Sequence, residues 1–277
     1  LQNLTSSALM LQRLNNTMTQ FSKSSMKVTI LGSGTSTGVP MIGCQCDVCL
    51  SQNPKNKRLR TSALVQTETA SLLLDCSTDF REQALRHKIE RIDALLLTHT
   101  HSDHISGLDD LRVYNFLQGE AIKIFSASHI LEDVRKRFDY CFNPKQIGGG
   151  VPELELIPVD GCFEFMGIKI TPLPVKHGDL PILGYRFNDF SYVTDASFIP
   201  EETIQKMMGT RVLVLNALRY MPHSTHYSLA EALEISQRIG PEKVWFTHIA
   251  HQMEHWATNR TLPPHARLAY DGLVIEI

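Results

Sequence analysis

The stretch Thr98-His99-Thr100-His101-Ser102-Asp103-His104 is the part of the sequence from which the fold can be inferred. It follows an apolar run, residues 94–97, that predicts a buried strand. Side chains alternate along an extended segment, so His99 and His101 are expected to point the same way. Asp103 and His104 can return to a neighbouring point after a tight turn. Surface histidines in a polar loop are the plain alternative, but four such groups with later histidines predict two neighbouring metal ions.

The composition excludes several classes of protein. The chain has 277 residues and a formal net charge of −2, so it lacks the overall positive charge of many nucleic-acid-binding proteins. Its apolar runs are shorter than a membrane span, so we expect no membrane partner. Six cysteines in a chain of this length do not form a disulfide framework. Three of them cluster, which favours metal binding and a reducing, cytoplasmic location.

The first 25 residues differ in composition from the rest. They are rich in Ser, Thr, Asn and Gln, and their only charged residues are Arg13 and Lys23. A disordered or added extension is one interpretation. An organellar targeting segment is the other, although the segment is poor in arginine for that role. We therefore expect a folded domain over residues 26–277 and an extension over residues 1–25.

The segment Cys44-Gln45-Cys46-Asp47-Val48-Cys49 predicts a second kind of metal site. Three thiolates this close can bind one tetrahedral Zn²⁺, which then needs a fourth ligand from elsewhere. A redox site or plain buried thiols are the alternatives. The preceding loop, residues 32–40, offers Ser36 and Thr37 as weak candidates for phosphate binding, although a simple tight turn explains its glycines equally well.

Predicted strands and helices alternate along the remaining chain. Ser228 and Glu231 form a predicted capping box at the start of one helix. The basic stretch 55–60 is expected to be a solvated loop, and Gly148-Gly149-Gly150 a mobile loop near the site. The expected strands are 27–31, 61–66, 71–76, 94–97, 123–126, 168–175, 185–187, 191–194, 212–215, 244–247 and 273–277, and the expected helices are 78–87, 108–117, 130–138 and 228–238.

The spacing His-x-His-x-Asp-His resembles the signature of the metallo-β-lactamase superfamily. The resemblance implies an α/β (α+β) fold, the αββα four-layer sandwich, over residues 26–277. It also implies two divalent ions, Zn or Mn, which supply hydroxide near neutral pH and stabilise negative charge on the attacked group. By this resemblance the first ion is bound by His99, His101 and His177, the second by Asp103, His104 and His248, and Asp195 bridges them. Asp75 is expected to support the metal-binding histidines.

The cysteine cluster resembles that of PhnP-type cyclic phosphodiesterases. In that family a histidine three residues beyond the last active-site histidine completes a structural zinc site, which here implies His251 with Cys44, Cys46 and Cys49. The family also has a histidine that is not a ligand, matched here by His226, with His223 as the second choice. The resemblance implies that it orients phosphate or protonates the leaving alkoxide. Helix capping is the alternative role for this segment.

The function implied by the resemblance is metal-dependent hydrolysis of small phosphodiesters, cyclic ones above all. The catalytic residues are expected to be His226, Asp103 and His223. Arg219 is a weak candidate for binding a phosphate oxygen. A tRNase Z-like endoribonuclease, a thioester hydrolase of the glyoxalase II kind and a non-enzymatic scaffold are the alternatives, less favoured in that order. The expected partner is a small phosphodiester rather than nucleic acid, and a homodimer is anticipated because similar proteins are often dimers.

Overall fold

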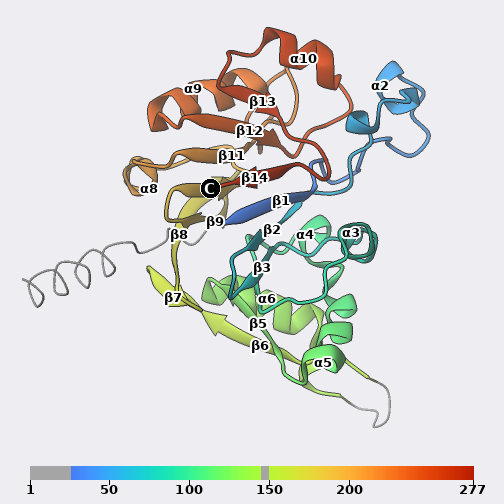
Figure 1. The fold of residues 1–277 in the computed structure, drawn as a ribbon, viewed down its shortest axis with the longest axis vertical. Coiled ribbons are helices and arrows are strands. Elements are labelled where there is room, and N and C mark those ends of the chain that lie inside the picture. Colours follow the sequence, from blue (N-terminus) through green and yellow to red (C-terminus); the bar gives the residue numbers. More distant parts are fainter. Residues whose placement is uncertain (1–25, 145–149) are drawn as a thin grey trace, which may run out of the picture.

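The computed structural model describes residues 26–144 and 150–277, and they form two packed sheets with helices on both outer faces (Figure 1). The first sheet has the order β14-β1-β2-β3-β4-β5-β6 and the second the order β13-β12-β11-β10-β9-β8-β7. The strands of the first sheet are β1 (Lys27–Gly32), β2 (Ser62–Gln66), β3 (Ser71–Leu74), β4 (Ala94–Leu96), β5 (Ile122–Ser126), β6 (Leu154–Pro158) and β14 (Val274–Glu276). Those of the second are β7 (Phe163–Phe165), β8 (Ile168–His177), β9 (Leu180–Phe187), β10 (Phe190–Val193), β11 (Val212–Asn216), β12 (Lys243–Thr247) and β13 (Ala266–Leu268).

The helices divide between the two outer faces. On the side of the first sheet lie α3 to α6, and on the side of the second lie α8 to α10 (Figure 1). The helical segments are α2 (Asp47–Leu50), η1 (Pro54–Asn56), α3 (Phe80–His87), α4 (Ser102–Ile105), η2 (Leu108–Leu111), α5 (Arg112–Gln118), α6 (Ser128–Arg137), α7 (Asp139–Phe142), α8 (Glu201–Met207), α9 (Leu229–Ile239) and α10 (His255–Thr261). Among the described residues, no helix is both long enough and apolar enough to cross a membrane.

Two apolar cores hold the layers together. The larger contains buried side chains of both sheets, such as Ile30 and Tyr185, together with side chains of α3 and α6. The second lies between the second sheet and helices α8 and α9, and includes Met207 and Ala232. This arrangement confirms the predicted αββα sandwich. Strand β3 is buried along its whole length because both of its faces are covered, which explains its continuous apolar sequence.

Parallel strands bring their carboxyl ends to one edge of each sheet. In the first sheet β3, β4, β5 and β6 are parallel, and in the second β10, β11, β12 and β13 are parallel. The segments that follow β3, β4, β10 and β12 carry most of the predicted metal ligands. The two sheets meet directly beside them, because the Leu183 N–H donates to the Thr98 carbonyl across the sheets at 3.0 Å.

Several predicted elements differ from those observed. The predicted helix 108–117 is divided into the 3₁₀ turn η2 and the α-helix α5. Strands β6, β7 and β13 and helices α8 and α10 were not predicted, since most of them are short and weakly patterned. The capping box at α9 is confirmed, with Ser228 and Glu231 each bonding the other's backbone. Of the expected mobile loop, Gly148 and Gly149 lie outside the described residues, as does the extension 1–25.

Candidate metal centre

Three residues that follow strands of the two sheets have left-handed backbone. Asp75 follows β3, Asp195 follows β10 and His248 follows β12, and their φ angles are 57°, 58° and 56°. Such a conformation costs a non-glycine residue on the order of 1–3 kcal/mol and persists only where the surrounding structure requires it. All three positions carry side chains predicted to bind or support metal, so the strain coincides with the site.

The structure brings the first predicted ligand set together. One ring nitrogen each of His99, His101 and His177 lies within 4.8 Å of the other two. The rings of His99 and His101 are 4.7 Å apart between centroids, and those of His101 and His177 are 5.0 Å apart. His99 and His177 are buried whereas His101 is exposed, so the set opens to solvent on the side of His101.

The second predicted set forms a neighbouring cluster. Donor atoms of Asp103, His104, Asp195 and His248 lie within 4.8 Å of one another. His104 Nε2 is 3.2 Å from Asp103 Oδ2 and 3.3 Å from Asp195 Oδ2. Asp195 also lies within 4.8 Å of His177, a member of the first set. Its carboxylate is therefore placed between the two sets, where a bridging ligand would be.

The chemistry of these donors fits divalent cations. His99 Nε2, His104 Nε2 and both ring nitrogens of His248 are buried without a hydrogen-bond partner. His248 Nε2 is only 3.0 Å from Asp195 Oδ1, but the two atoms do not have hydrogen-bond geometry. Buried polar atoms are ordinarily paired, and nitrogen and carboxylate donors that converge in this way suit Zn²⁺ or Mn²⁺.

Neighbouring groups fix the orientation of two of the predicted ligand rings. Asp75 accepts hydrogen bonds from Thr98 N at 2.8 Å and from Thr98 Oγ1 at 2.9 Å, and it lies 2.7 Å from His104 Nδ1. His177 Nδ1 donates to the carbonyl oxygen of Thr225 at 2.6 Å. With Nδ1 engaged, the Nε2 atoms of His104 and His177 are left to face a cation.

The charges of the centre depend on one another. Burial raises the pKa of Asp75, although His104 and Thr98 oppose the shift. Burial would also raise the pKa of Asp195, but His248 and His104 hold it well below its ordinary value. The same surroundings raise the pKa of His104, because three carboxylates outweigh its burial. Carboxylates therefore favour the charged form of the His104 ring, whereas burial holds the pKa of His99 well below its ordinary value.

His226 lies at the junction of the two sets. Its Nε2 is 3.0 Å from Asp195 Oδ1, and its ring centroid is 4.5 Å from that of His177 and 4.9 Å from that of His248. Burial lowers its pKa to about 4. His223 is further out, with its Nδ1 3.4 Å from His226 Nδ1. Of the two predicted candidates, His226 is therefore the one in contact with the centre.

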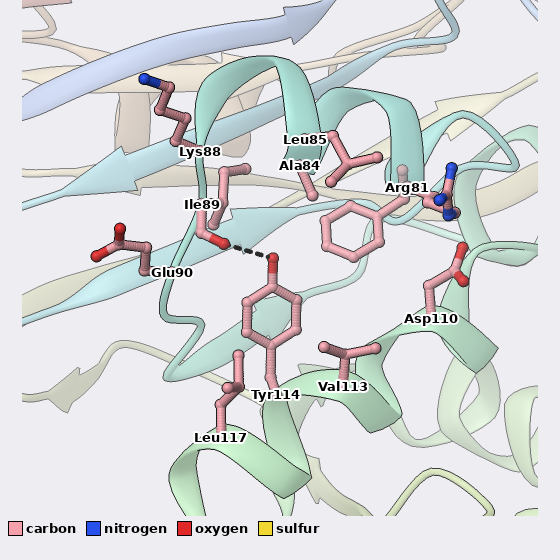
Figure 2. Close-up of a pocket in the computed structure, with 11 residues that line it drawn as sticks. Arg81, Ala84, Leu85, Lys88, Ile89, Glu90, Asp110, Val113, Tyr114 and Leu117 are labelled. Carbon is pink, nitrogen blue, oxygen red and sulfur yellow. Dashed lines mark hydrogen bonds between the residues drawn. The ribbon is translucent and has the colours of Figure 1, made fainter.

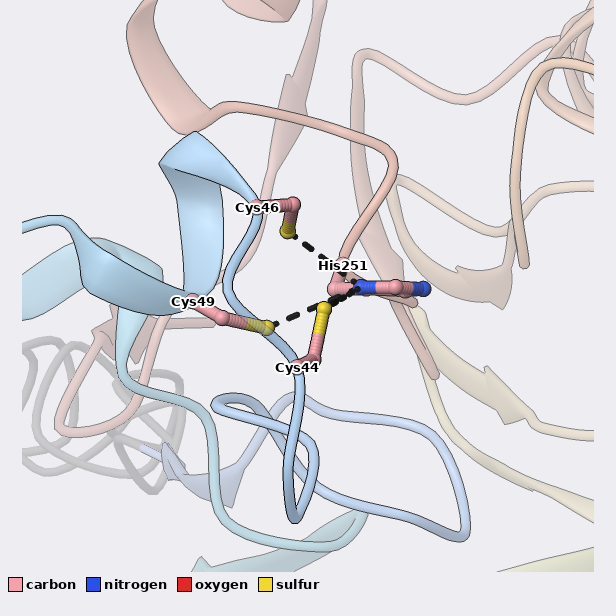
Figure 3. A group of neighbouring side chains, drawn as sticks. All are labelled: Cys44, Cys46, Cys49 and His251. Carbon is pink, nitrogen blue, oxygen red and sulfur yellow. Dashed lines mark hydrogen bonds between the residues drawn. The ribbon is translucent and has the colours of Figure 1, made fainter.

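The structure also gathers the cysteine cluster around His251 (Figure 3). His251 Nδ1 lies 3.2 Å from Cys44 Sγ, 3.4 Å from Cys46 Sγ and 3.6 Å from Cys49 Sγ. The backbone N–H of Cys49 is the main cause that lowers the pKa of Cys46 to about 6, whereas burial raises that of Cys49 to about 11. Three sulfurs and one imidazole nitrogen at a common point are a ligand set that Zn²⁺ prefers.

The weak substrate-binding candidates are placed less favourably. Ser36 and Thr37 are exposed, in a turn closed by a 2.8 Å bond from Gly38 N to Thr35 O. This turn lies beside the centre, since Thr35 N donates to Ile249 O. The Arg219 guanidinium donates to the carbonyls of Met221 and Pro222, at 3.2 and 3.0 Å, so it holds its own loop.

The expectation of a solvated basic loop at residues 55–60 was wrong for two residues. Arg58 is 1% exposed, and Asn56 is fully buried. Arg58 Nη1 donates to Ala250 O at 3.1 Å, and Nη2 donates to Met253 O at 2.7 Å. Arg58 thereby joins the segment that follows the cysteines to the loop that carries His251. No local sequence signal distinguishes it from the half-buried Lys and Arg residues around it.

Thr225 is a second residue that the sequence did not single out. Besides accepting from His177 through its carbonyl, it places its hydroxyl 2.9 Å from His226 Nδ1. Its position directly before His226 is the only signal that could have identified it.

Comparisons with known proteins agree with this architecture. A family model described as the beta-lactamase superfamily domain matches residues 71–249. The crystal structure of a diphosphatase from the PhnP family is 40% identical in sequence and has a TM-score of 0.86, with 91% of this chain and 97% of that chain covered. An octanoyltransferase of Porphyromonas gingivalis is 40% identical over 253 residues, which cover 90% of this chain and 51% of the relative. The chain thus spans about half the length of that relative. Ribonuclease Z of Methanopyrus kandleri is 26% identical over 267 residues, 81% of this chain and 94% of the relative. The chain therefore belongs to the beta-lactamase superfamily, among the PhnP-type hydrolases of the metallo-β-lactamase fold.

Proposed function

We propose that the protein is a metal-dependent hydrolase of small phosphoric diesters, with cyclic ribose-type diesters as the preferred class. The observation that carries this proposal is the position of His226, whose Nε2 lies 3.0 Å from Asp195 at the junction of the two ligand sets. A hydrolytic centre that also has an adjacent imidazole can both attack phosphorus and assist the departing oxygen.

The chain's own residues would divide the work as follows. When bound, two divalent cations supply hydroxide for attack and neutralise charge on the phosphoryl oxygens. One cation would be held by His99, His101 and His177. The other would be held by Asp103, His104 and His248, and Asp195 would contact both cations. Asp75 and Thr225 keep the histidine ligands His104 and His177 in the orientation that binding requires.

His226 supplies the proton in this proposal. Its Nε2 would deliver a proton to the leaving alkoxide oxygen, while the Thr225 hydroxyl holds the ring through Nδ1. Burial disfavours the charged ring. The negative charge of a bound phosphodiester would favour it, so we expect protonation to accompany substrate binding.

A phosphoric anhydride is the second candidate substrate. The structure with 40% identity is described as a diphosphatase, which supports P–O–P bridges as a second class of substrate. A phosphate leaving group needs less help from a proton donor than an alkoxide does. The contact between His226 and Asp195 is therefore the feature that favours diesters with poor leaving groups.

The deciding experiment compares hydrolysis of cyclic and linear diesters, diphosphates and precursor tRNA by metal-loaded protein. On cyclic ribose diesters, His226→Ala should lower kcat/KM by about 10²–10⁴-fold, the usual contribution of general acid catalysis. On bis(p-nitrophenyl) phosphate the loss should be much smaller, because nitrophenolate leaves unaided. His87→Ala, on α3 away from the centre, is the matched control.

Each alternative has its own outcome. If His226→Ala lowered kcat/KM equally on both diesters, His226 would not be the proton donor. If His223→Ala instead lowered kcat/KM on the cyclic diester alone, His223 would be the proton donor. Cleavage of diphosphates alone would establish the second candidate. Efficient removal of a 3′ trailer from precursor tRNA, without cleavage of small diesters, would favour the ribonuclease Z-like alternative.

A further inference from the structure

A buried amide lies beside the metal centre and binds the main chain next to a predicted ligand. Asn216, the last residue of β11, is fully buried. Its Oδ1 accepts from Ala196 N at 2.8 Å, and its Nδ2 donates to Ala196 O at 2.9 Å. An amide side chain carries both a donor and an acceptor, so this one group satisfies both polar atoms of the Ala196 backbone.

The pairing of the strands ends before it reaches this point. The last paired residues of β10 and β11 are Val193 and Leu215. Asp195 and Ala196 come after this pair, and the φ angle of Asp195 is 58°. Such a backbone conformation persists only where the surrounding structure requires it. The two bonds from Asn216 continue the pairing through a side chain, and they hold the chain directly after Asp195.

The backbone of Ala196 also joins the two residues on which the proposed chemistry depends. Ala196 directly follows Asp195, and its carbonyl oxygen accepts a second hydrogen bond, from Tyr227 N at 2.8 Å. Tyr227 in turn directly follows His226. A displacement of Ala196 would therefore move the Asp195 carboxylate relative to the His226 imidazole, and these two groups are 3.0 Å apart between Oδ1 and Nε2.

We propose that Asn216 is a positioning residue that sets the separation between the Asp195 carboxylate and the His226 imidazole. It acts through the backbone of Ala196 and not on the substrate. For Asp195 the effect is on cation binding, and for His226 it is on proton transfer to the leaving group. The second effect rests on the proposed function, whereas the first requires only that the centre binds cations.

Asn115 on α5 makes the same double contact away from the centre, so it is the matched control. It is 7% exposed, its Nδ2 donates to Glu153 O at 3.0 Å, and its Oδ1 accepts from Glu153 N at 2.9 Å. The neighbouring Tyr114 donates to the Ile89 carbonyl at 2.9 Å, and none of the residues drawn around it in Figure 2 is a predicted metal ligand. Glu153 directly precedes β6, at the opposite edge of the sheet from the residues that follow β3 and β4.

The first test titrates Mn²⁺ into protein whose centre has been emptied by dialysis against a chelator, and follows free Mn²⁺ by electron paramagnetic resonance. Mn²⁺ is used because thiolates favour Zn²⁺, so the cysteine site contributes little. Asn216→Leu keeps the shape of the side chain but removes both bonds, and it should raise the dissociation constant by about 10–100-fold. Asn115→Leu should leave the dissociation constant unchanged although it also lowers thermal stability. If a leucine variant fails to fold, Asn216→Ala and Asn115→Ala take its place. Unchanged Mn²⁺ affinity in the Asn216 variant overturns the proposal.

The second test compares the hydrolysis of two diesters at saturating Mn²⁺. Asn216→Leu should lower kcat/KM on a cyclic ribose diester more than on bis(p-nitrophenyl) phosphate, because only the poorer leaving group needs the proton that His226 would deliver. Asn115→Leu should change neither value. An equal loss on both diesters would contradict the role of Asn216 in placing His226. If the wild type hydrolyses neither diester while Asn216→Leu still weakens Mn²⁺ binding, the proposed function fails and the role of Asn216 at Asp195 stands.

Discussion

Replacement of Arg58 by methionine should loosen the segment that follows the cysteines from the loop that carries His251. The guanidinium is 1% exposed and donates to the carbonyls of Ala250 and Met253 and to Asn56 Oδ1, at 3.1, 2.7 and 3.2 Å. Arg58→Met keeps much of the side-chain volume but removes all three donors. Asn56 Oδ1 still accepts from His255 N, so the two carbonyls bear the loss.

The change in the free energy of unfolding follows from two opposing contributions. Each buried carbonyl deprived of its donor costs about 1–3 kcal/mol, which gives roughly 2–6 kcal/mol for the pair. Burial lowers the pKa of Arg58 to about 10 from its ordinary 12.5, and removing that buried charge returns roughly 3 kcal/mol. Ala250 O keeps a 3.4 Å bond from Met253 N, which reduces the loss a little. The net change therefore lies between about −1 and +3 kcal/mol, so we expect a destabilisation of at most about 3 kcal/mol.

The assay combines urea unfolding with competition for zinc by a chelator. Because Arg58 positions the loop that carries His251, zinc binding should weaken by about tenfold or more, as when the support of a metal ligand is removed. Arg60→Met is the matched control, since Arg60 is partly exposed and pairs with Asp79 at 2.9 Å. Such a pair is worth at most about 1 kcal/mol. If Arg58→Met and Arg60→Met had the same stability and zinc affinity, Arg58 would not join the two segments.

Four other predictions concern other parts of the two metal sites and the buried Asp271. Cys46→Ser should reduce both zinc content and thermal stability, because structural zinc contributes to folding. Cys162→Ser, at an exposed thiol, should change neither quantity, and metal analysis and calorimetry measure both. Asp75→Asn should weaken metal binding at the centre by about 10–100-fold in a titration, and unchanged affinity would contradict its supporting role. Thr225→Val should slow hydrolysis of cyclic diesters at full metal content, and Thr225→Ser should recover it; equal rates for all three proteins would show that the hydroxyl does not hold His226. Burial raises the pKa of Asp271 to about 6 from 3.8, so the folded protein holds this proton more tightly than the unfolded chain does. As the pH rises from about 4 to about 6, the free energy of unfolding should therefore fall by up to roughly 3 kcal/mol. A urea-unfolding series over pH checks this, and Asp271→Asn should flatten the curve in that range.

Much of the fold was predictable because its strongest signals are local. The apolar residues of β3 and β11 identify buried strands without any tertiary information. Metal-capable residues directly after such strands, as in His248 after β12, could be expected to meet because parallel strands end at one edge. The pairing of ligands into sets came from a family resemblance, and the structure places those residues together.

The features that escaped prediction depend on distant partners. Arg58 and Asn56 stand in a polar stretch, and their burial depends on Ala250 and Glu254, almost 200 residues further along the chain.

The left-handed backbone at Asp75, Asp195 and His248 has a consequence for the evolution of the site. Glycine adopts this conformation freely, so a change such as Asp195→Gly would relieve strain of about 1–3 kcal/mol, and it would also remove a buried carboxylate. Asp195→Gly would also leave His104 and His248 without the carboxylate that they face. Retention of all three residues in a lineage would therefore record continued selection for their side chains, since the backbone conformation alone favours glycine.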